Sequence, residues 1–141
     1  MSNSKKPFYI SESISITTKE IHSFCSLTGD SQNLHLNLKK AKKGFFGKII
    51  IPGILLMGKI PQTHFEMLRK KERLPRETEI ILEEITAKFT KPVFPGQKIK
   101  YFWYLKSVKK HKLGLEKIWN VVLKVGKEDK AYFELCTIYL I

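Results

Sequence analysis

The sequence lacks several features that mark special classes of protein, such as many cysteines, a long apolar run or a signal peptide. It holds two cysteines in 141 residues. Cys25 and Cys136 form no CxxC pair and flank no histidine at zinc-ligand spacing, so we expect buried, reduced thiols and no metal site. No apolar run approaches the ~18 residues that a membrane span requires. The polar, basic start lacks the apolar segment of a signal peptide, which predicts a cytoplasmic protein.

Acidic residues are also scarce. Lysines and arginines number 26 against 13 aspartates and glutamates, giving a formal net charge of +13. Such a chain attracts nucleic acid, an anionic membrane surface, a nucleotide-bearing cofactor or an acidic carrier protein, and charge alone does not choose among them. A solvated, lysine-rich surface needs no partner at all. The aromatic run from Tyr101 to Tyr104 favours a sheet core, because no nucleic-acid motif accompanies it.

The length fits one domain over residues 1–141, and we expect residues 1–7 to form a flexible N-terminus. Alternating polarity from Phe8 to Ile16 predicts a short extended segment. The next helix opens at a capping box formed by Thr17 and Glu20, and a glycine at position 29 ends it. A short basic helix is predicted over Lys39–Lys43, where Gly44 ends it.

Pro52 and Gly53 open the segment that we expect to form the core helix. Proline suits the first helical position, and the residues that follow are apolar on nearly every face, which predicts a buried helix. The helical pattern continues to about Arg73. Because Pro61 lacks an N–H and crowds the preceding turn, we expect a kink or break there.

The C-terminal half is rich in Ile, Val, Phe, Tyr and Trp, and turn-like residues divide it into four long segments. These predict four consecutive strands in a meander. A sheet that wraps one buried helix gives an α+β architecture. The four segments are Glu77–Phe89, Lys98–Val108, Leu113–Val125 and Ala131–Ile141.

One short stretch carries candidate chemistry. Asp30 and His35, separated by four residues, lie in a predicted loop after the first helix, and together they offer an acid/base pair. Gly53, in the first turn of the core helix, offers a backbone N–H without a partner inside the helix. Proton transfer beside a carbonyl needs both elements. Taken singly, the three residues have ordinary roles as a loop histidine, a turn aspartate and a packing glycine. His22, His64 and His111 lack such a context and are interpreted as surface or packing residues.

Three motifs, in this order, resemble those of the MaoC-like or (R)-specific enoyl-CoA hydratase family, which has the hotdog fold. Gly29–His35 is similar to G-D-x-N-P-[LIV]-H. Ile49–Leu56 is similar to the helix start [IV]-[VA]-[HP]-G-[ML]-L, and Phe89–Gln97 to F-x-x-P-V-F-x-G-D. The resemblance covers roughly residues 8–141.

The chain departs from these motifs at four positions. Gln32 and Asn33 stand where the family usually has asparagine and proline. Pro52 replaces a frequent histidine, and Gln97 replaces a frequent aspartate or glutamate. The reactive side chains of the first motif are retained.

The resemblance implies a single hotdog domain, an antiparallel sheet around one long helix, that assembles as a homodimer or higher homo-oligomer. It implies a lyase of fatty acid metabolism that reversibly hydrates trans-2-enoyl-CoA, or the carrier-protein thioester, to the (3R)-3-hydroxyacyl thioester without a cofactor. Asp30 and His35 would share the proton transfers around one water, and Gly53 would be the oxyanion donor. We expect lysines 40, 42 and 48 near substrate phosphates. The residues expected to bind substrate are Gln32, Asn33, Pro52, Ile54, Lys39 and Lys43.

Other functions stay open at this point. A hotdog thioesterase would hydrolyse the same substrates, although the spacing of Asp30 and His35 favours water addition. A non-catalytic module that binds acyl thioesters is a second alternative, to which the changes at Gln32 and Asn33 give weight. Nucleic-acid binding is a remote third.

Overall fold

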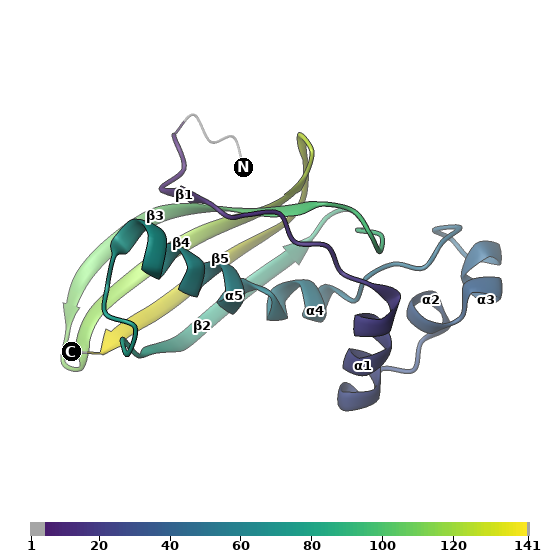
Figure 1. The fold of residues 1–141 in the computed structure, drawn as a ribbon, viewed down its shortest axis with the longest axis horizontal. Coiled ribbons are helices and arrows are strands. Elements are labelled where there is room, and N and C mark those ends of the chain that lie inside the picture. The colour runs from purple at the N-terminus through teal and green to yellow at the C-terminus, as the bar shows by residue number, and fades with distance from the viewer. Residues whose placement is uncertain (1–4, 141) are drawn as a thin grey trace.

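The computed structural model describes residues 5–140 (Figure 1). Residues 1–4 of the expected N-terminal segment and Ile141 of the last predicted strand lie outside the described residues. No described helix is long and apolar enough to cross a bilayer. In chain order the elements are β1 (Tyr9–Ile10), α1 (Thr18–Thr28), α2 (Asn33–Leu36), α3 (Leu38–Lys43), α4 (Gly53–Gly58), α5 (Ile60–Met67), the π-helix η1 (Leu68–Glu72), β2 (Ile80–Phe89), β3 (Ile99–His111), β4 (Gly114–Val125) and β5 (Glu128–Leu140).

A five-stranded antiparallel sheet forms the body of the protein, with the strand order β1-β3-β4-β5-β2. Figure 1 shows α4 and α5 lying along one face of this curved sheet, while α1, α2 and α3 gather beyond one of its ends. Sheet and helix therefore share one core, and the predicted α+β class is confirmed.

The predicted four-strand meander is wrong for its first strand. Strands β3, β4 and β5 form the meander. Strand β2 pairs with β5 at one edge of the sheet and is not a neighbour of β3. The connection from β2 to β3, residues 90–98, is too long for a tight hairpin and contains two prolines, which cannot donate to a strand ladder. It packs into the core at Val93, whose carbonyl accepts a hydrogen bond from the Ile51 N–H at 2.9 Å.

Local signals in the N-terminal half predicted helix ends well. The Thr17 hydroxyl accepts from the Glu20 N–H at 3.1 Å and the Glu20 carboxylate accepts from the Thr17 N–H at 3.0 Å, so the capping box is confirmed. Gly29 ends α1 with a left-handed φ of 80°. The basic helix is confirmed over Leu38–Lys43. The extended segment narrows to the two residues of β1 and a bridge between Ile14 and Ile99.

The core helix breaks at Lys59, between α4 and α5, two residues before Pro61. The predicted break is confirmed. Pro61 causes it, because proline lacks an N–H donor and crowds the carbonyl four residues earlier. The prediction of burial on every face is only partly right. Ile54 is 63% exposed and Phe65 39% exposed, so one stripe of the broken helix is not covered by the sheet.

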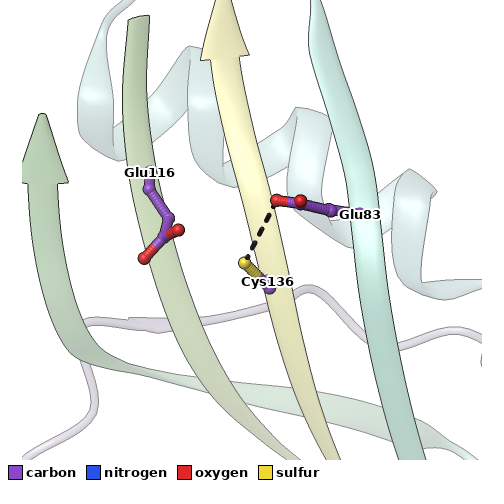
Figure 2. Close-up of side chains that lie close together, drawn as sticks. All are labelled: Glu83, Glu116 and Cys136. Carbon is purple, nitrogen blue, oxygen red and sulfur yellow. Dashed lines mark hydrogen bonds between the residues drawn. The ribbon is translucent and has the colours of Figure 1, made fainter. Parts of the chain in front are cut away.

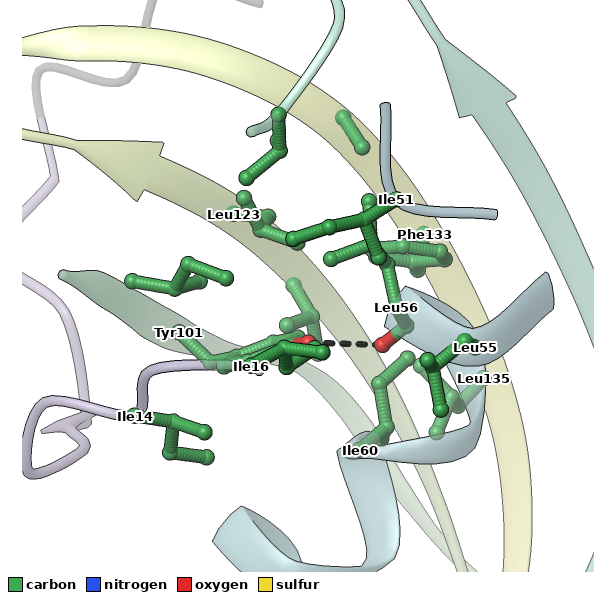
Figure 3. Close-up of a cluster of buried hydrophobic side chains, with 14 of the residues drawn as sticks. Ile14, Ile16, Ile51, Leu55, Leu56, Ile60, Tyr101, Leu123, Phe133 and Leu135 are labelled. Atoms are coloured by element: carbon green, nitrogen blue, oxygen red, sulfur yellow. Dashed lines mark hydrogen bonds between the residues drawn. The ribbon is translucent and has the colours of Figure 1, made fainter. Parts of the chain in front are cut away.

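Two hydrogen bonds from β3 hold the broken helix to the sheet. The fully buried Tyr101 hydroxyl donates to the Leu56 carbonyl at 2.6 Å, as Figure 3 shows among the surrounding aliphatic side chains. The buried Trp103 indole N–H donates to the Thr63 hydroxyl at 3.1 Å. One bond holds α4 and the other holds α5, so the position of each half is fixed separately.

Replacing Tyr101 with phenylalanine should lower the free energy of unfolding by about 1–2 kcal/mol, because the buried Leu56 carbonyl loses its donor. Urea unfolding of the variant and the wild type measures the difference. Tyr104→Phe is the matched control, since Tyr104 points to the opposite face of β3 and is half-buried. Equal stability of Tyr101→Phe and Tyr104→Phe would contradict the role given to the hydrogen bond.

Candidate functional site

Asp30 follows directly on the left-handed turn that ends α1. The Gly29 N–H donates to the Cys25 carbonyl at 2.9 Å, and glycine tolerates the positive φ that this C-terminal cap requires. The chain therefore turns sharply, and the side chain of Asp30 stays 27% exposed at the end of the helix.

Gln32 holds one oxygen of the Asp30 carboxylate. Asp30 Oδ1 accepts from the Gln32 side-chain amide at 3.1 Å and from the Gln32 N–H at 3.3 Å. This leaves Oδ2 turned toward His35. Gln32 thus orients the carboxylate with two donors, of which only the side-chain amide depends on the residue type at position 32.

His35 lies in the one-turn helix α2. The prediction that it lies in a loop is therefore wrong. Its side chain is 7% exposed. Ile50, in the segment after α3, holds His35 in place. The Ile50 N–H donates to the Leu34 carbonyl at 3.0 Å, and the Ile50 carbonyl lies 2.8 Å from His35 Nδ1. A carbonyl only accepts, so Nδ1 carries the proton in the neutral ring and Nε2 presents a lone pair.

His35 Nε2 lies 3.7 Å from Asp30 Oδ2. That separation is too long for a direct hydrogen bond, and it suits two groups that share a third molecule such as water. The imidazole comes from α2 and the carboxylate from the turn before α2, and the two groups converge.

Gly53 and His35 line the same cavity of about 210 Å³, whose wall also includes Phe46, Phe89 and Lys91. Gly53 is the first residue of α4, and within residues 5–140 its N–H makes no hydrogen bond. A Cβ at this position would lie 3.0 Å from the nearest atom of the Phe89 ring. The backbone of Gly53 is thus approached closely, and a side chain would narrow the cavity.

The other residues expected to bind substrate are placed unevenly. Pro52 is buried, and its carbonyl accepts from the N–H groups of the first turn of α4. Ile54 faces a different, apolar cavity. Asn33 is exposed, and its carbonyl accepts from the N–H of Asn37. Lys39 and Lys43 are exposed on α3 and line neither cavity.

Gln97, a further departure from the family motif, acts as a turn cap. Its side-chain carbonyl accepts from the Phe94 N–H at 2.9 Å, in a turn where Gly96 has a φ of 85°. A carboxylate at this position would accept the same bond. The substitution therefore leaves the connection from β2 to β3 intact.

A second cavity, of about 340 Å³, lies between α4–α5 and strands β2 and β5. Its lining is almost entirely apolar and includes Phe24, Ile54, Ile60 and Leu135. The polar exceptions are His64 and Thr137. An apolar cavity that begins one residue beyond Gly53 has the character of a site for an aliphatic chain.

His64 belongs to a polar chain that the sequence did not suggest. Its Nε2 lies 2.8 Å from the Tyr139 hydroxyl, which donates to Glu72 Oε1 at 2.8 Å, and Lys117 Nζ lies 2.6 Å from Glu72 Oε2. Because the tyrosine proton goes to the carboxylate, the tyrosine oxygen accepts from His64 Nε2–H. The prediction of a packing residue is confirmed by its burial, and the alternative of a surface residue is wrong. Only its helical spacing from Ile60 signalled an inward position.

The two cysteines are both free, but only Cys25 is fully buried, which corrects the prediction for Cys136. Figure 2 shows Cys136 with Glu83 and Glu116 on three adjacent strands, and their ligand atoms lie within 4.8 Å of one another. Burial and the charges of Glu116 and Glu83 raise the pKa of the Cys136 thiol. A thiol that keeps its proton is a poor metal ligand, so this cluster carries no assignment.

A family model described as MaoC-like domain matches residues 2–126. The chain belongs to the MaoC-like family. The resemblance stated from the three motifs is thereby confirmed, and with it the hotdog fold. No curated protein sequence matches this MaoC-like chain.

Solved structures share the fold of this MaoC-like chain at low sequence identity. An (R)-hydratase from A. caviae involved in PHA biosynthesis has a TM-score of 0.76 at 18% identity, over 97% of this chain and 98% of its own. The R-hydratase PhaJ1 from Pseudomonas aeruginosa has a TM-score of 0.69 at 20% identity, over 95% and 85%. The HadBC (3R)-hydroxyacyl-ACP dehydratase complex from Mycobacterium tuberculosis has a TM-score of 0.71 at 12% identity, over 92% and 94%.

The buried histidine predicts a pH dependence of stability. Burial, and then the charge of Lys117, lower the pKa of His64 from 6.5 to about 4. The unfolded chain therefore binds this proton before the folded protein does, and stability is lost as the pH falls from about 6.5 to about 4. The full contribution is about 3 kcal/mol, present above that window. Urea unfolding at several pH values measures it.

His64→Gln should flatten the stability profile in this window, because glutamine keeps a donor for Tyr139 and does not titrate. His22→Gln, on the exposed side of α1, serves as the control and should follow the wild type. Parallel profiles for His64→Gln and the wild type would rule out His64 as the source.

Proposed function

We propose that this protein reversibly hydrates trans-2-enoyl thioesters to (3R)-3-hydroxyacyl thioesters, with Asp30 and His35 as the acid/base pair. The observation that carries the proposal is the convergence of Asp30 Oδ2 and His35 Nε2, 3.7 Å apart, beside the cavity that also contains Gly53. Membership of the MaoC-like family supports the same reaction class.

The two side chains suit the reaction in complementary ways. His35 Nε2 carries the lone pair, since Nδ1 is held by the Ile50 carbonyl, and Asp30 keeps one oxygen free of Gln32. A water between them loses a proton to the pair while its oxygen bonds to C3 of the enoyl group. A proton from the pair then reaches C2, so the net change is the addition of one water. Dehydration is the reverse.

The thioester oxygen gains negative charge as water adds at C3, and it needs a donor placed in advance. We assign this role to the Gly53 N–H. Gly53 begins α4 and lines the cavity of His35, and its N–H makes no hydrogen bond to another described residue. The absence of a side chain at position 53 lets the thioester approach the backbone.

The acyl chain would extend into the apolar cavity next to Ile54. That cavity is bordered by β2, whose outer edge pairs with no other strand among residues 5–140. Ile81, Leu82 and Phe89 of this strand are exposed. An open strand edge with apolar residues is a surface that proteins cover. We therefore propose a homodimer that pairs near β2 and closes the cavity.

Asp30→Asn and His35→Ala should each lower kcat/KM for crotonyl-CoA hydration by about 10²–10⁴-fold, because each removes one member of the proton-transferring pair. The loss of the conjugated enoyl thioester absorbance measures the rate. His22→Ala is the control, since His22 is exposed on α1 and lines neither cavity.

Full activity in either site variant would refute the proposal. Release of free thiol, in place of a hydroxyacyl thioester, would identify a thioesterase. Tight binding of the substrate without turnover by the wild type would identify a binding module. Light scattering on the same samples gives the oligomeric state, and a monomeric mass at micromolar concentration would contradict the homodimer.

Gly53→Ala should lower kcat/KM at least about tenfold, because the new Cβ occupies the approach of the thioester. It should also cost about 1–3 kcal/mol of stability, since the Cβ would lie 3.0 Å from Phe89. The double variant Gly53→Ala/Phe89→Leu separates the two effects. We expect it to recover the stability and not the activity.

The single variant Phe89→Leu is the control for any effect of the aromatic ring itself. Recovery of activity together with stability in the double variant would mean that Gly53 is only a packing glycine.

A further inference from the structure

Two stretches of the chain carry lysines and no acidic residue: residues 90–115, with seven lysines, and the stretch that includes His35 and Gly53. No aspartate or glutamate occurs from Ser31 to Phe65, a stretch that holds six lysines. Of these, only Lys59 has an ion-pair partner within residues 5–140, Glu20 at 3.3 Å. The other five are Lys39, Lys40, Lys42, Lys43 and Lys48.

The lysines of α3 face outward together. Ala41 is the buried residue of this helix. At about 100° per residue, the four lysines spread over about 160° of the surface opposite Ala41. Figure 1 shows α3 at one end of the molecule, far from the β3–β4 turn at the other end. The helix therefore presents a broad, cationic, convex face.

The helix dipole accounts for only part of this face. Positive charges near a helix C-terminus are favourable, which suits Lys40, Lys42 and Lys43 in the last turn. Lys39 lies in the first turn, where the partial positive charge of the helix end disfavours it. The dipole of α3 therefore does not explain Lys39.

An exposed aromatic residue lies next to this cationic face. Phe45 is 97% exposed and packs edge to face on Phe46, with ring centroids 5.0 Å apart. Phe46 in turn lines the cavity of His35 and Gly53. Phe45 and Phe46 thus follow α3 in the chain and lead to the wall of the candidate site. An exposed aromatic residue beside charged residues is typical of protein interfaces.

We propose that this surface docks an acidic acyl carrier protein, so that the enoyl thioester arrives on a carrier and not on free coenzyme A. The surface, named here the basic end, consists of Lys39, Lys40, Lys42, Lys43, Phe45 and Lys48. This inference rests on the proposed hydration of acyl thioesters and names its partner. The phosphates of a small nucleotide need cations that converge on one point, whereas the lysines of α3 diverge from a convex helix. Diverging charges fit a large acidic surface.

The test compares two variants with the same change in charge. K40Q/K42Q/K43Q/F45S alters the basic end. K109Q/K110Q/K112Q/L113S alters the exposed β3–β4 turn at the opposite end of the molecule. Each loses three positive charges and one exposed apolar side chain.

Binding of crotonyl-loaded acyl carrier protein is measured by fluorescence anisotropy near physiological salt. The basic-end variant should bind at least about tenfold more weakly than the wild type, because its charge complementarity is lost. The β3–β4 variant should stay within about twofold, since exposed charges farther apart than ~10 Å are largely screened. In hydration assays, the basic-end changes should reduce kcat/KM at least about tenfold further for the carrier substrate than for crotonyl-CoA, through KM.

Four results would overturn the docking proposal. The first is that the wild type turns over crotonyl-CoA and binds no carrier, which leaves the hydratase proposal intact. The second is that both variants weaken carrier binding equally, and the third is that the basic-end changes reduce kcat/KM equally for both substrates. Binding of anionic vesicles through the basic end, without carrier binding, would point to a membrane instead. Carrier binding that depends on the basic end without hydration of either substrate would support docking and refute the hydratase.

Discussion

The hydrogen bond from Tyr101 to the Leu56 carbonyl is the contact on which the geometry of the site depends most. It holds α4 to the sheet just before the helix breaks, and Gly53 lies three residues earlier on the same short helix. Trp103 holds α5 independently through Thr63. Because a six-residue helix is marginal by itself, its position relative to the sheet depends on this buried donor together with the core packing of Leu55 and Leu56.

The acid/base pair is attached to the same helix by a very short connection. Ile50 bonds the ring and the backbone of α2, Ile51 donates to the Val93 carbonyl, and Pro52 opens α4. Three consecutive residues thus join the imidazole of His35 to the N–H of Gly53. This connection keeps the proposed proton-transferring groups and the proposed oxyanion donor in a fixed relation even though they come from different elements.

Local rules predicted the parts of this fold that depend on neighbouring residues, and the failures were non-local. The capping box of Thr17 and Gly29 determine the ends of α1 within a few residues of sequence. The pairing of β2 with β5 depends on how the connection after β2 crosses the core at Val93. The hydrophobic periodicity of the sequence does not reveal that path. His64 likewise gains its role from Tyr139, 75 residues away. In the site, the residue types were predictable from the motif, but the way Gln32 orients Asp30 needed coordinates.

The chain carries more apolar and more cationic surface than one copy can bury or neutralise, and the two surpluses are separated in space. The apolar excess lies along the broken helix and the open edge of β2, where Ile54 and Leu82 are exposed. One cationic surface lies at α3, beyond the end of the sheet. An acyl group on a carrier has the same division, an aliphatic chain at one end and an acidic protein at the other. The Asp30–His35 pair lies between the two surfaces, where the thioester that joins those ends would be held.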